Sequence, residues 1–212
     1  MATAPENESD LDLGEEFLQF LEEKRSIRNY KPDAVEPEKI ELMVRAALSA
    51  PFSGKSPCWH ILAVNDAKVR DRVQRAATAG LNKMNFWVRT APTILVLCAK
   101  PGAAKKRQGI AYYLVDSALA MERASLMAHQ LGLGSCWIGN FDERGVKRAC
   151  RIPSGIRVVG LLSLGYPEED GESIMGVPVI NDFDQYYDLI RSKFDRDKRV
   201  PLRSAFSYNY FP

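Results

Sequence analysis

The stretch from Thr93 to Ala99, TILVLCA, is apolar at nearly every position. Successive side chains of a strand point to opposite faces of its sheet, so this composition predicts a strand that is buried on both faces. With 212 residues the chain is long enough for one well-buried core, and nothing in its composition suggests a second. We therefore expect this strand to lie inside a single domain.

Helices are predicted before and after this strand. A helix that begins at Pro37 has acidic residues at its positive end and must stop before Pro51. Residues 110–131 contain neither Pro nor Gly and are apolar almost all round, which predicts a core helix. The other expected elements are a helix from about Asp12 to Lys24, a helix from Asp66 to Gly80, a short helix capped by Asp142, and strands at 60–65 and 157–167.

The two ends of the chain differ in character from its middle. Residues 1–10 are expected to be disordered, and residues 11–168 are expected to form the core domain. Residues 169–212 form a C-terminal extension that is rich in Phe and Tyr. A segment with so many aromatic side chains is expected to pack on a surface, and the partner subunit of an oligomer is a candidate for that surface.

Composition argues against several classes of protein. The net charge of +2 and the absence of a recognised nucleic-acid module argue against a nucleic-acid-binding protein. The longest apolar stretches fall far short of the roughly 20 residues that span a bilayer. The acidic, polar start has no basic region followed by an apolar one, so we expect neither a secretory signal nor a transit peptide. A cytoplasmic protein without membrane or nucleic-acid partners is the simplest expectation.

Side chains typical of catalysis are scarce. The four cysteines form no C-x-x-C pair, and no Cys/His spacing typical of a metal site occurs. The motifs H-E-x-x-H and G-x-S-x-G are also absent. If the protein is an enzyme, we expect a bound cofactor to carry the chemistry, with no catalytic side chain and no metal.

Two basic clusters lie on predicted loops. One consists of Lys24, Arg25 and Arg28 around Ser26, directly after the first helix, and the other, far along the chain, contains Lys198 and Arg199. Guanidinium and ammonium groups donate charge-assisted hydrogen bonds to phosphate oxygens, and a serine hydroxyl can add another. Each cluster alone is also typical of a solvated basic surface, so the charges by themselves leave both interpretations open.

A glycine-punctuated stretch, GLGSCWIGNF, follows the long core helix. Its glycines allow a flat ligand to approach the backbone closely, and Trp137 and Ile138 supply apolar surface. The spacing is not a dinucleotide fingerprint, because the stretch follows a helix instead of opening one after a strand. A tight turn from helix to strand is the alternative interpretation.

Taken in order, these features resemble the nitroreductase family of FMN-dependent oxidoreductases. The resemblance rests on R-S-x-R after the first helix, a helix ending in S-A-P and a polar loop closed by Trp59, and Ala-Pro before the buried strand. It continues through G-L-G-x-x-W-I-G after the core helix, an I-P-x-G turn, a strand ending in L-G-Y-P, and a late basic element with proline. It covers about residues 17–203.

The resemblance implies an α+β sandwich in which helices wrap a mostly antiparallel sheet. It also implies an intertwined homodimer with two FMN sites at its interface. The C-terminal extension would then pack on the partner subunit and contribute to binding of the FMN phosphate.

The resemblance also implies a set of cofactor-binding residues. Lys24, Arg25, Ser26 and Arg28 would lie on the phosphate, ribityl and pyrimidine side of FMN, with Arg28 stabilising the charge of the reduced flavin. The loop of residues 49–56 would reach the same flavin from the other subunit. The full set of implied residues is Lys24, Arg25, Ser26, Arg28, Pro51, Phe52, Ser53, Lys55, Ile138, Gly139, Asn140, Lys198 and Arg199.

The loop after the second predicted helix departs from the family's usual A-P-S-x-x-N-x-Q-P-W. It reads APFSGKSPCW, so Phe52 takes the place of Ser, Lys55 of Asn, Pro57 of Gln and Cys58 of Pro. Lysine only donates and proline offers no side-chain hydrogen bond, so the loop's contacts with FMN do not carry over individually. Asn85 is a weak candidate for an Asn that often precedes the Ala-Pro pair.

The activity implied is transfer of a hydride from NADH or NADPH through flavin N5 to a small acceptor, such as a nitroaromatic or a quinone. Two alternatives stay open. One is another flavin reaction of the family, such as enone reduction, dehalogenation, azoline oxidation or flavin breakdown. The other is a flavin-binding protein without turnover. The short basic segment at residues 100–113 hints at an anionic acceptor or at the phosphate of the nicotinamide cofactor.

Overall fold

A computed structural model describes residues 8–168 of the chain. Its centre is an antiparallel sheet of four strands in the order β1-β2-β6-β5. These strands are β1 (Trp59–Val64), β2 (Thr93–Ala99), β5 (Gly134–Ile138) and β6 (Arg157–Gly165). The α+β architecture and the antiparallel sheet are as the resemblance implies.

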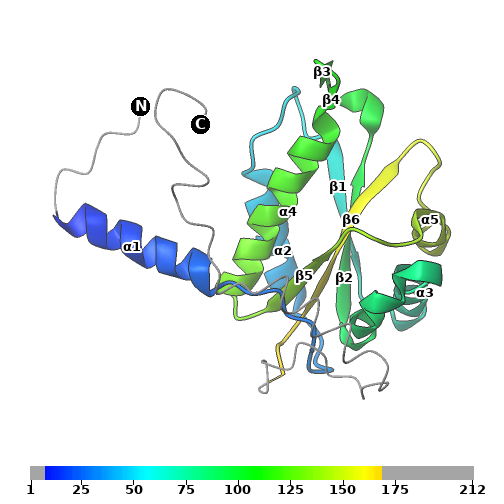
Figure 1. The fold of residues 1–212 in the computed structure, drawn as a ribbon, viewed down its shortest axis with the longest axis horizontal. Coiled ribbons are helices and arrows are strands. Elements are labelled where there is room, and N and C mark those ends of the chain that lie inside the picture. The colour runs from blue at the N-terminus through cyan, green and yellow to red at the C-terminus, as the bar shows by residue number, and fades with distance from the viewer. Residues whose placement is uncertain (1–7, 169–212) are drawn as a thin grey trace. The chain divides into compact units, whose positions relative to one another are not determined.

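Helices cover both faces of the sheet (Figure 1). One face packs against α2 (Pro37–Leu48) and α4 (Tyr112–Gln130), and the other against α3 (Ala67–Ala77), α5 (Glu143–Cys150) and the 3-10 segment η1 (Gly80–Thr90). The helix α1 (Glu8–Glu23) precedes these elements. The connection from β2 to α4 holds a 3-10 turn, η2 (Pro101–Ala103), and a small hairpin of β3 (Lys106–Arg107) and β4 (Ile110–Ala111).

The core is divided by β2, every residue of which is buried. Leu95 and Leu97 join the hydrophobic cluster on the α2 and α4 face. Ile94 and Val96 join the cluster on the opposite face, against α3 and α5. The alternation follows from the two-residue period of a strand, and it confirms the prediction of burial on both faces.

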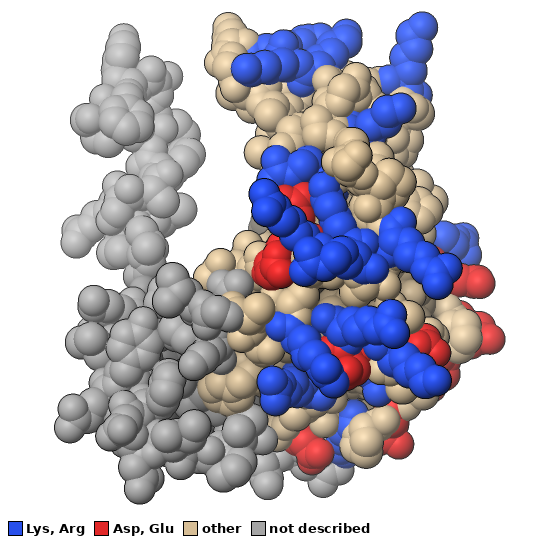
Figure 2. Space-filling view, turned by 90° about the vertical axis from the view of Figure 1, so that its right-hand side faces the viewer, with Lys and Arg blue, Asp and Glu red and all other residues tan. Residues whose placement is uncertain are grey.

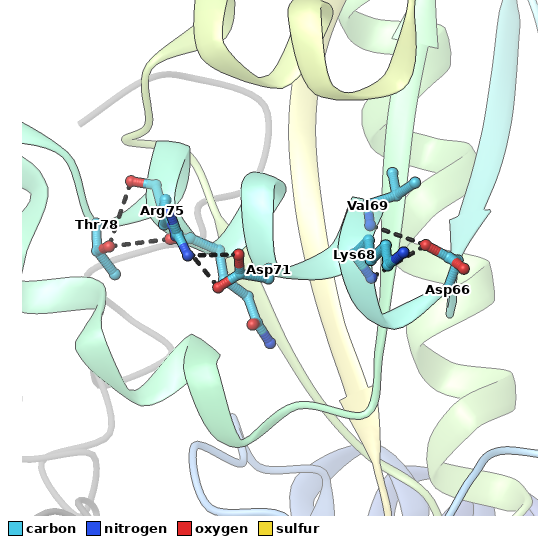
Figure 3. A network of polar contacts seen from close by, with 7 residues as sticks. Asp66, Lys68, Val69, Asp71, Arg75 and Thr78 are labelled. Carbon is cyan, nitrogen blue, oxygen red and sulfur yellow. Dashed lines mark hydrogen bonds and ion pairs between the residues drawn. The ribbon is translucent and has the colours of Figure 1, made fainter.

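Most predicted helix N-termini are confirmed, with two differences. Helix α1 begins at Glu8 instead of near Asp12, because acidic residues in a first turn are stabilised by the positive end of the helix dipole. Asp66 caps α3 as expected, accepting from the backbone N–H groups of Lys68 and Val69 (Figure 3). Asp142 precedes α5, but its side chain makes no capping hydrogen bond, and its carboxylate lies 3.7 Å from Arg148.

Two further findings correct the expectations. The 3-10 segment η1 and the hairpin of β3 and β4 were not predicted. The long helix α4 is not a fully buried core helix: Leu114, Val115 and Leu119 are 46%, 39% and 42% exposed. Helix α4 therefore leaves a group of large apolar side chains that no described residue covers. Among the described residues, no helix is both long and apolar enough to cross a bilayer.

Two glycines let the segment after α1 approach the sheet closely. A Cβ at Gly134 of β5 would lie 2.7 Å from the side chain of Ile27. A Cβ at Gly165 of β6 would lie 3.1 Å from the ring of Tyr30 and 2.6 Å from Pro92, which precedes β2. Contacts this short do not occur between real Cβ atoms, so each position requires a residue without a side chain. Gly134 thereby fixes how near residues 26–28 come to β5.

We expect Gly134→Ala to destabilise the protein by about 1–3 kcal/mol, because the added methyl group overpacks against Ile27. The midpoint of thermal or urea unfolding measures this loss. Gly155→Ala is the matched control, since a Cβ there meets nothing within 4 Å. Equal stability of the two variants would show that the segment can move away from β5 without cost.

Candidate functional site

The segment that follows α1 runs along the edge of the sheet. Ser26 forms a parallel bridge with Ser135 of β5, and the backbone N–H of Ile27 donates to the Ser135 carbonyl at 3.0 Å. Further on, Tyr30 forms an antiparallel bridge with Pro167, just beyond β6. The basic cluster of the sequence is therefore held beside β5 instead of standing free in solvent.

Tyr30 anchors this segment in the core. Its side chain is only 3% exposed, and its hydroxyl lies 2.7 Å from Ser163 Oγ and also donates to the carbonyl of Ile27. Burial raises the pKa of the Tyr30 hydroxyl well above its usual value, so the group stays protonated and remains a donor. The buried phenol thus ties the backbone on both sides of Arg28 to β6.

The two arginines of this segment make their described contacts with backbone carbonyls and with an aromatic ring. Arg28 lies over the ring of Trp87 at 5.6 Å from its centroid, and its Nη1 donates to the Ser26 carbonyl at 3.4 Å. Arg25 donates to backbone carbonyls, those of Glu22 and Lys24. Within the described part of the chain, neither guanidinium forms an ion pair with Asp or Glu. Such a group attracts an anion, and the guanidinium fork suits a phosphate or a carboxylate.

The backbone at residues 138–140 lies at the end of β5, and η1 fixes it. Ile138 is buried, whereas Gly139 and Asn140 are exposed. The Nδ2 of Asn85 donates to the Asn140 carbonyl at 2.6 Å and to the Ala77 carbonyl at 3.0 Å. Asn85, a weak candidate from the sequence, therefore positions the backbone after β5.

The same 3-10 segment carries Trp87, which sequence reasoning missed. Its indole is 5% exposed and lies under the Arg28 guanidinium. Trp87 and Asn85 together link the arginine segment to the backbone at 138–140. A Trp two residues after an Asn in NFWVR was the available signal, but only the fold shows what each side chain contacts.

A second cluster forms where the loop after α2 meets the start of α4. Asp116 is only 3% exposed. Its carboxylate accepts from the Ser53 backbone N–H at 3.1 Å and from Ser53 Oγ at 2.9 Å. The Cys58 thiol also donates to it, at 3.6 Å. This carboxylate, which sequence reasoning missed, holds both ends of the loop from inside the protein.

The thiol of Cys58 acts here as a donor and not as a nucleophile. Burial, followed by the nearby Asp116 carboxylate, raises the pKa of this thiol to about 11. The group is therefore protonated at neutral pH, as donation to Asp116 requires. A proline at this position, as in the family pattern, would offer no such donor, which gives the departure at Cys58 a physical role.

The remaining predicted residues of this loop face outward. Pro51, Phe52 and Lys55 are exposed, and Phe52 is 37% exposed. They are held in place through Ser53, but they contact none of the basic residues after α1 among the described contacts. Their side chains are available to a group that lies outside this single chain.

The structure joins some predicted residues and separates others. Residues 24–28 and 138–140 meet at β5 through η1. The loop is held at a different level of α4. Ser125 of α4 contacts β5, with its Oγ 3.2 Å from Ser135 Oγ. Asp116, which holds the loop, precedes Ser125 by nine residues, or about 14 Å of helix. Lys198 and Arg199 lie outside the described residues. Among the described residues, no cluster of three His, Cys, Asp or Glu side chains could hold a metal ion.

Comparisons with known proteins bear on the family and the fold of the chain. The model of the Nitroreductase family matches residues 21–166. A protein of Archaeoglobus fulgidus named as an NADH dehydrogenase/NAD(P)H nitroreductase is 32% identical over 160 residues, 74% of this chain and 88% of that protein. An NAD(P)H FMN reductase of Bacillus subtilis is 26% identical over 73% of this chain and 67% of its own length. The crystal structure of a nitroreductase family protein from Clostridium novyi superposes with a TM-score of 0.68 at 28% identity, covering 73% of this chain and 86% of that one.

We expect Asp116→Ala to release the loop from α4. The change leaves the Ser53 donors and the Cys58 thiol without their acceptor, which costs about 1–3 kcal/mol of stability. Hydrogen exchange of residues 53–58 should speed up in this variant. Glu122→Ala, at an exposed position of the same helix, is the control and should change neither quantity. Unchanged exchange in Asp116→Ala would show that the loop is held by other contacts.

Proposed function

Because the chain belongs to the nitroreductase family, we propose that it is an FMN-dependent oxidoreductase that uses NADH or NADPH to reduce a small acceptor, such as a nitroaromatic or a quinone. The observation that carries the proposal is the pair of guanidinium groups, Arg25 and Arg28, which follow α1 beside β5 and have no acidic partner among residues 8–168. The names of the relatives support an NAD(P)H oxidoreductase, and the FMN reductase among them supports a flavin.

The residues present fit FMN. Arg25 and Arg28 supply positive charge for its phosphate and for the electron-rich edge of its ring, and the hydroxyl of Ser26 lies between them in the sequence. Gly139 leaves the backbone after β5 open to a flat ring, and Asn85 holds that backbone in place. Lys24 and the two residues outside the described part, Lys198 and Arg199, complete the proposed phosphate contacts.

Bound FMN would supply the redox chemistry, since it accepts a hydride from NAD(P)H and passes electrons to the second substrate. The protein's own groups then bind and orient. Arg28 supplies a guanidinium group, which donates in a fixed fork geometry. The cation–π contact with the Trp87 ring limits the movement of the Arg28 side chain, so its charge stays beside β5. No acidic or basic catalyst is required from the chain.

We also propose that the active form is a homodimer. Three large side chains of α4, Leu114, Val115 and Leu119, are exposed on one stripe, and Leu48 at the end of α2 is 51% exposed. Exposed apolar surface of this kind is typical of an interface. The loop at residues 51–55 is held at Asp116, about 14 Å along α4 from Ser125, the residue that contacts β5, so we infer that the loop serves the FMN site of the partner subunit.

The first experiment asks whether the purified protein holds FMN and how Arg28 contributes. We expect a flavin absorbance spectrum, bleached by anaerobic NADH or NADPH. In Arg28→Ala the dissociation constant for FMN should rise about tenfold or more, because a hydrogen-bonded charge is lost. Arg144→Ala, an exposed arginine of α5, is the matched control. A protein that binds no FMN on reconstitution would refute the proposed function, and flavin that is not reduced would leave a binding protein without turnover.

The dimer makes a separate prediction. Leu119→Glu places a charge in the exposed stripe of α4, so it should convert the dimer to a monomer and lower FMN retention. Gln130→Glu, exposed at the far end of the same helix, adds a similar charge outside the stripe and should leave the dimer intact. Sedimentation velocity measures the mass of each variant. A Leu119→Glu protein that stays dimeric would place the interface elsewhere.

A further inference from the structure

The connection between β2 and α4 holds a short, well-defined hairpin. Lys106 pairs with Ala111 and Arg107 pairs with Ile110. The two residues between the strands, Gln108 and Gly109, have φ angles of 49° and 82°. Positive φ at both central positions is the geometry of a type I′ turn, which suits the twist of a two-stranded hairpin. The hairpin therefore presents Lys106 and Arg107 from a defined backbone.

The connection that carries this hairpin is basic along its sequence. Residues 99–115 contain four cations and no Asp or Glu. The loop after α2 adds Lys55, since the backbone of Gly54 lies near Ala103 and the Lys100 N–H donates to the Cys58 carbonyl at 2.8 Å. We call this set the basic rim. Its members are Lys55, Lys100, Lys105, Lys106 and Arg107, all of them exposed.

The cations of the basic rim differ from those on the face formed by α3 and α5. There several arginines have acidic partners, for example Arg75 with Asp71 at 2.8 Å and Arg157 with Glu143 at 2.9 Å (Figure 3 shows the first pair). Figure 2 shows acidic side chains among the basic ones over that face and none at the end that carries β3 and β4. Within the described part of the chain, no member of the basic rim forms an ion pair. The rim's charge is therefore available to a ligand.

We propose that the basic rim binds the 2′-phosphate of NADPH and makes NADPH the preferred electron donor. The inference rests on the proposed function, because the loop that carries Lys55 is the loop proposed to reach the flavin. The rim's cations come from two stretches of chain, so together they can contact a large, polyanionic substrate. A 2′-phosphate adds close to two negative charges to such a substrate, and NADH lacks them.

Two observations favour the nucleotide over a small anionic acceptor. The rim's side chains are exposed, which suits the end of a long donor that remains at the surface while its nicotinamide ring reaches the flavin. In addition, Ile110 is paired with Arg107 and is 49% exposed. An apolar side chain beside a guanidinium offers an adenine ring a surface to stack on and its phosphate a partner.

The test compares donors in a variant and in a matched control. Lys106→Gln with Arg107→Gln removes two charges from the rim, and Lys68→Gln with Arg72→Gln removes two exposed charges from α3. We expect the wild type to favour NADPH over NADH in kcat/KM by about tenfold, and the rim variant to lose most of that preference while the α3 variant keeps it. Raising the ionic strength from about 0.02 M to about 0.3 M should also shrink the preference, because exposed charges are screened.

A titration without turnover separates this proposal from the proposed function. Adenosine 2′,5′-bisphosphate should bind the wild-type protein more tightly than adenosine 5′-monophosphate, and the rim variant should bind the two alike. A protein without FMN would overturn the proposed function, yet this titration would still decide on the rim. Equal use of NADH and NADPH with no tighter binding of the bisphosphate would overturn the rim proposal. The rim proposal would also be overturned if the rim variant changed only the ratio of rates with 4-nitrobenzoate and the neutral 4-nitrobenzyl alcohol. That result would show that the rim's charge acts on the acceptor and not on the electron donor.

Discussion

The burial of β2 on both faces is the constraint on which the rest of the structure depends. Its side chains alternate between two hydrophobic clusters, so two separate sets of helices must pack on one sheet. Antiparallel pairing with β6 on one side and β1 on the other satisfies its backbone groups. With the sheet fixed in this way, β5 becomes an edge strand, and its free side is where the segment after α1 adds a further bridge.

The segment after α1 can lie close to β5 and β6 because each strand has a glycine, without a side chain, at the point of contact. Gly134 has no side chain where Ile27 lies, and Gly165 has none where Pro92 and Tyr30 lie. Tyr30 then reaches Ser163 through a buried hydroxyl. The positions of Arg25 and Arg28 therefore follow from contacts in the core and not from the arginines themselves. A charge held by the core loses little conformational freedom when it binds an anion, which favours affinity.

Much of this fold could be predicted from local patterns. The apolar run predicts the buried strand β2, Pro37 predicts the start of α2, and Asp66 predicts the cap of α3, and each of these signals depends on one short stretch of chain. The 3-10 segment η1 could not be predicted in this way, because its role depends on contacts with residues far away in the sequence. Trp87 contacts Arg28, and Asn85 donates to the carbonyl of Asn140. The role of Asp116 was missed for the same reason. A charged residue inside an apolar helix was a visible signal, but its partners lie in a loop far away in the sequence.

The sequence of helix α4 predicts a core helix, and the structure confirms this for only one side of the helix. Ala120, Met121 and Ala124 pack against the sheet and α2, and Asp116 on the inner side holds the loop after α2. Leu114, Val115 and Leu119 are as apolar as the buried residues, yet they face outward. Hydrophobicity alone does not tell a core from an interface, because both exclude water. In the proposed dimer the same helix would bury this stripe against the partner and position the loop that the partner's cofactor meets, so assembly and the site would be coupled through one rigid element.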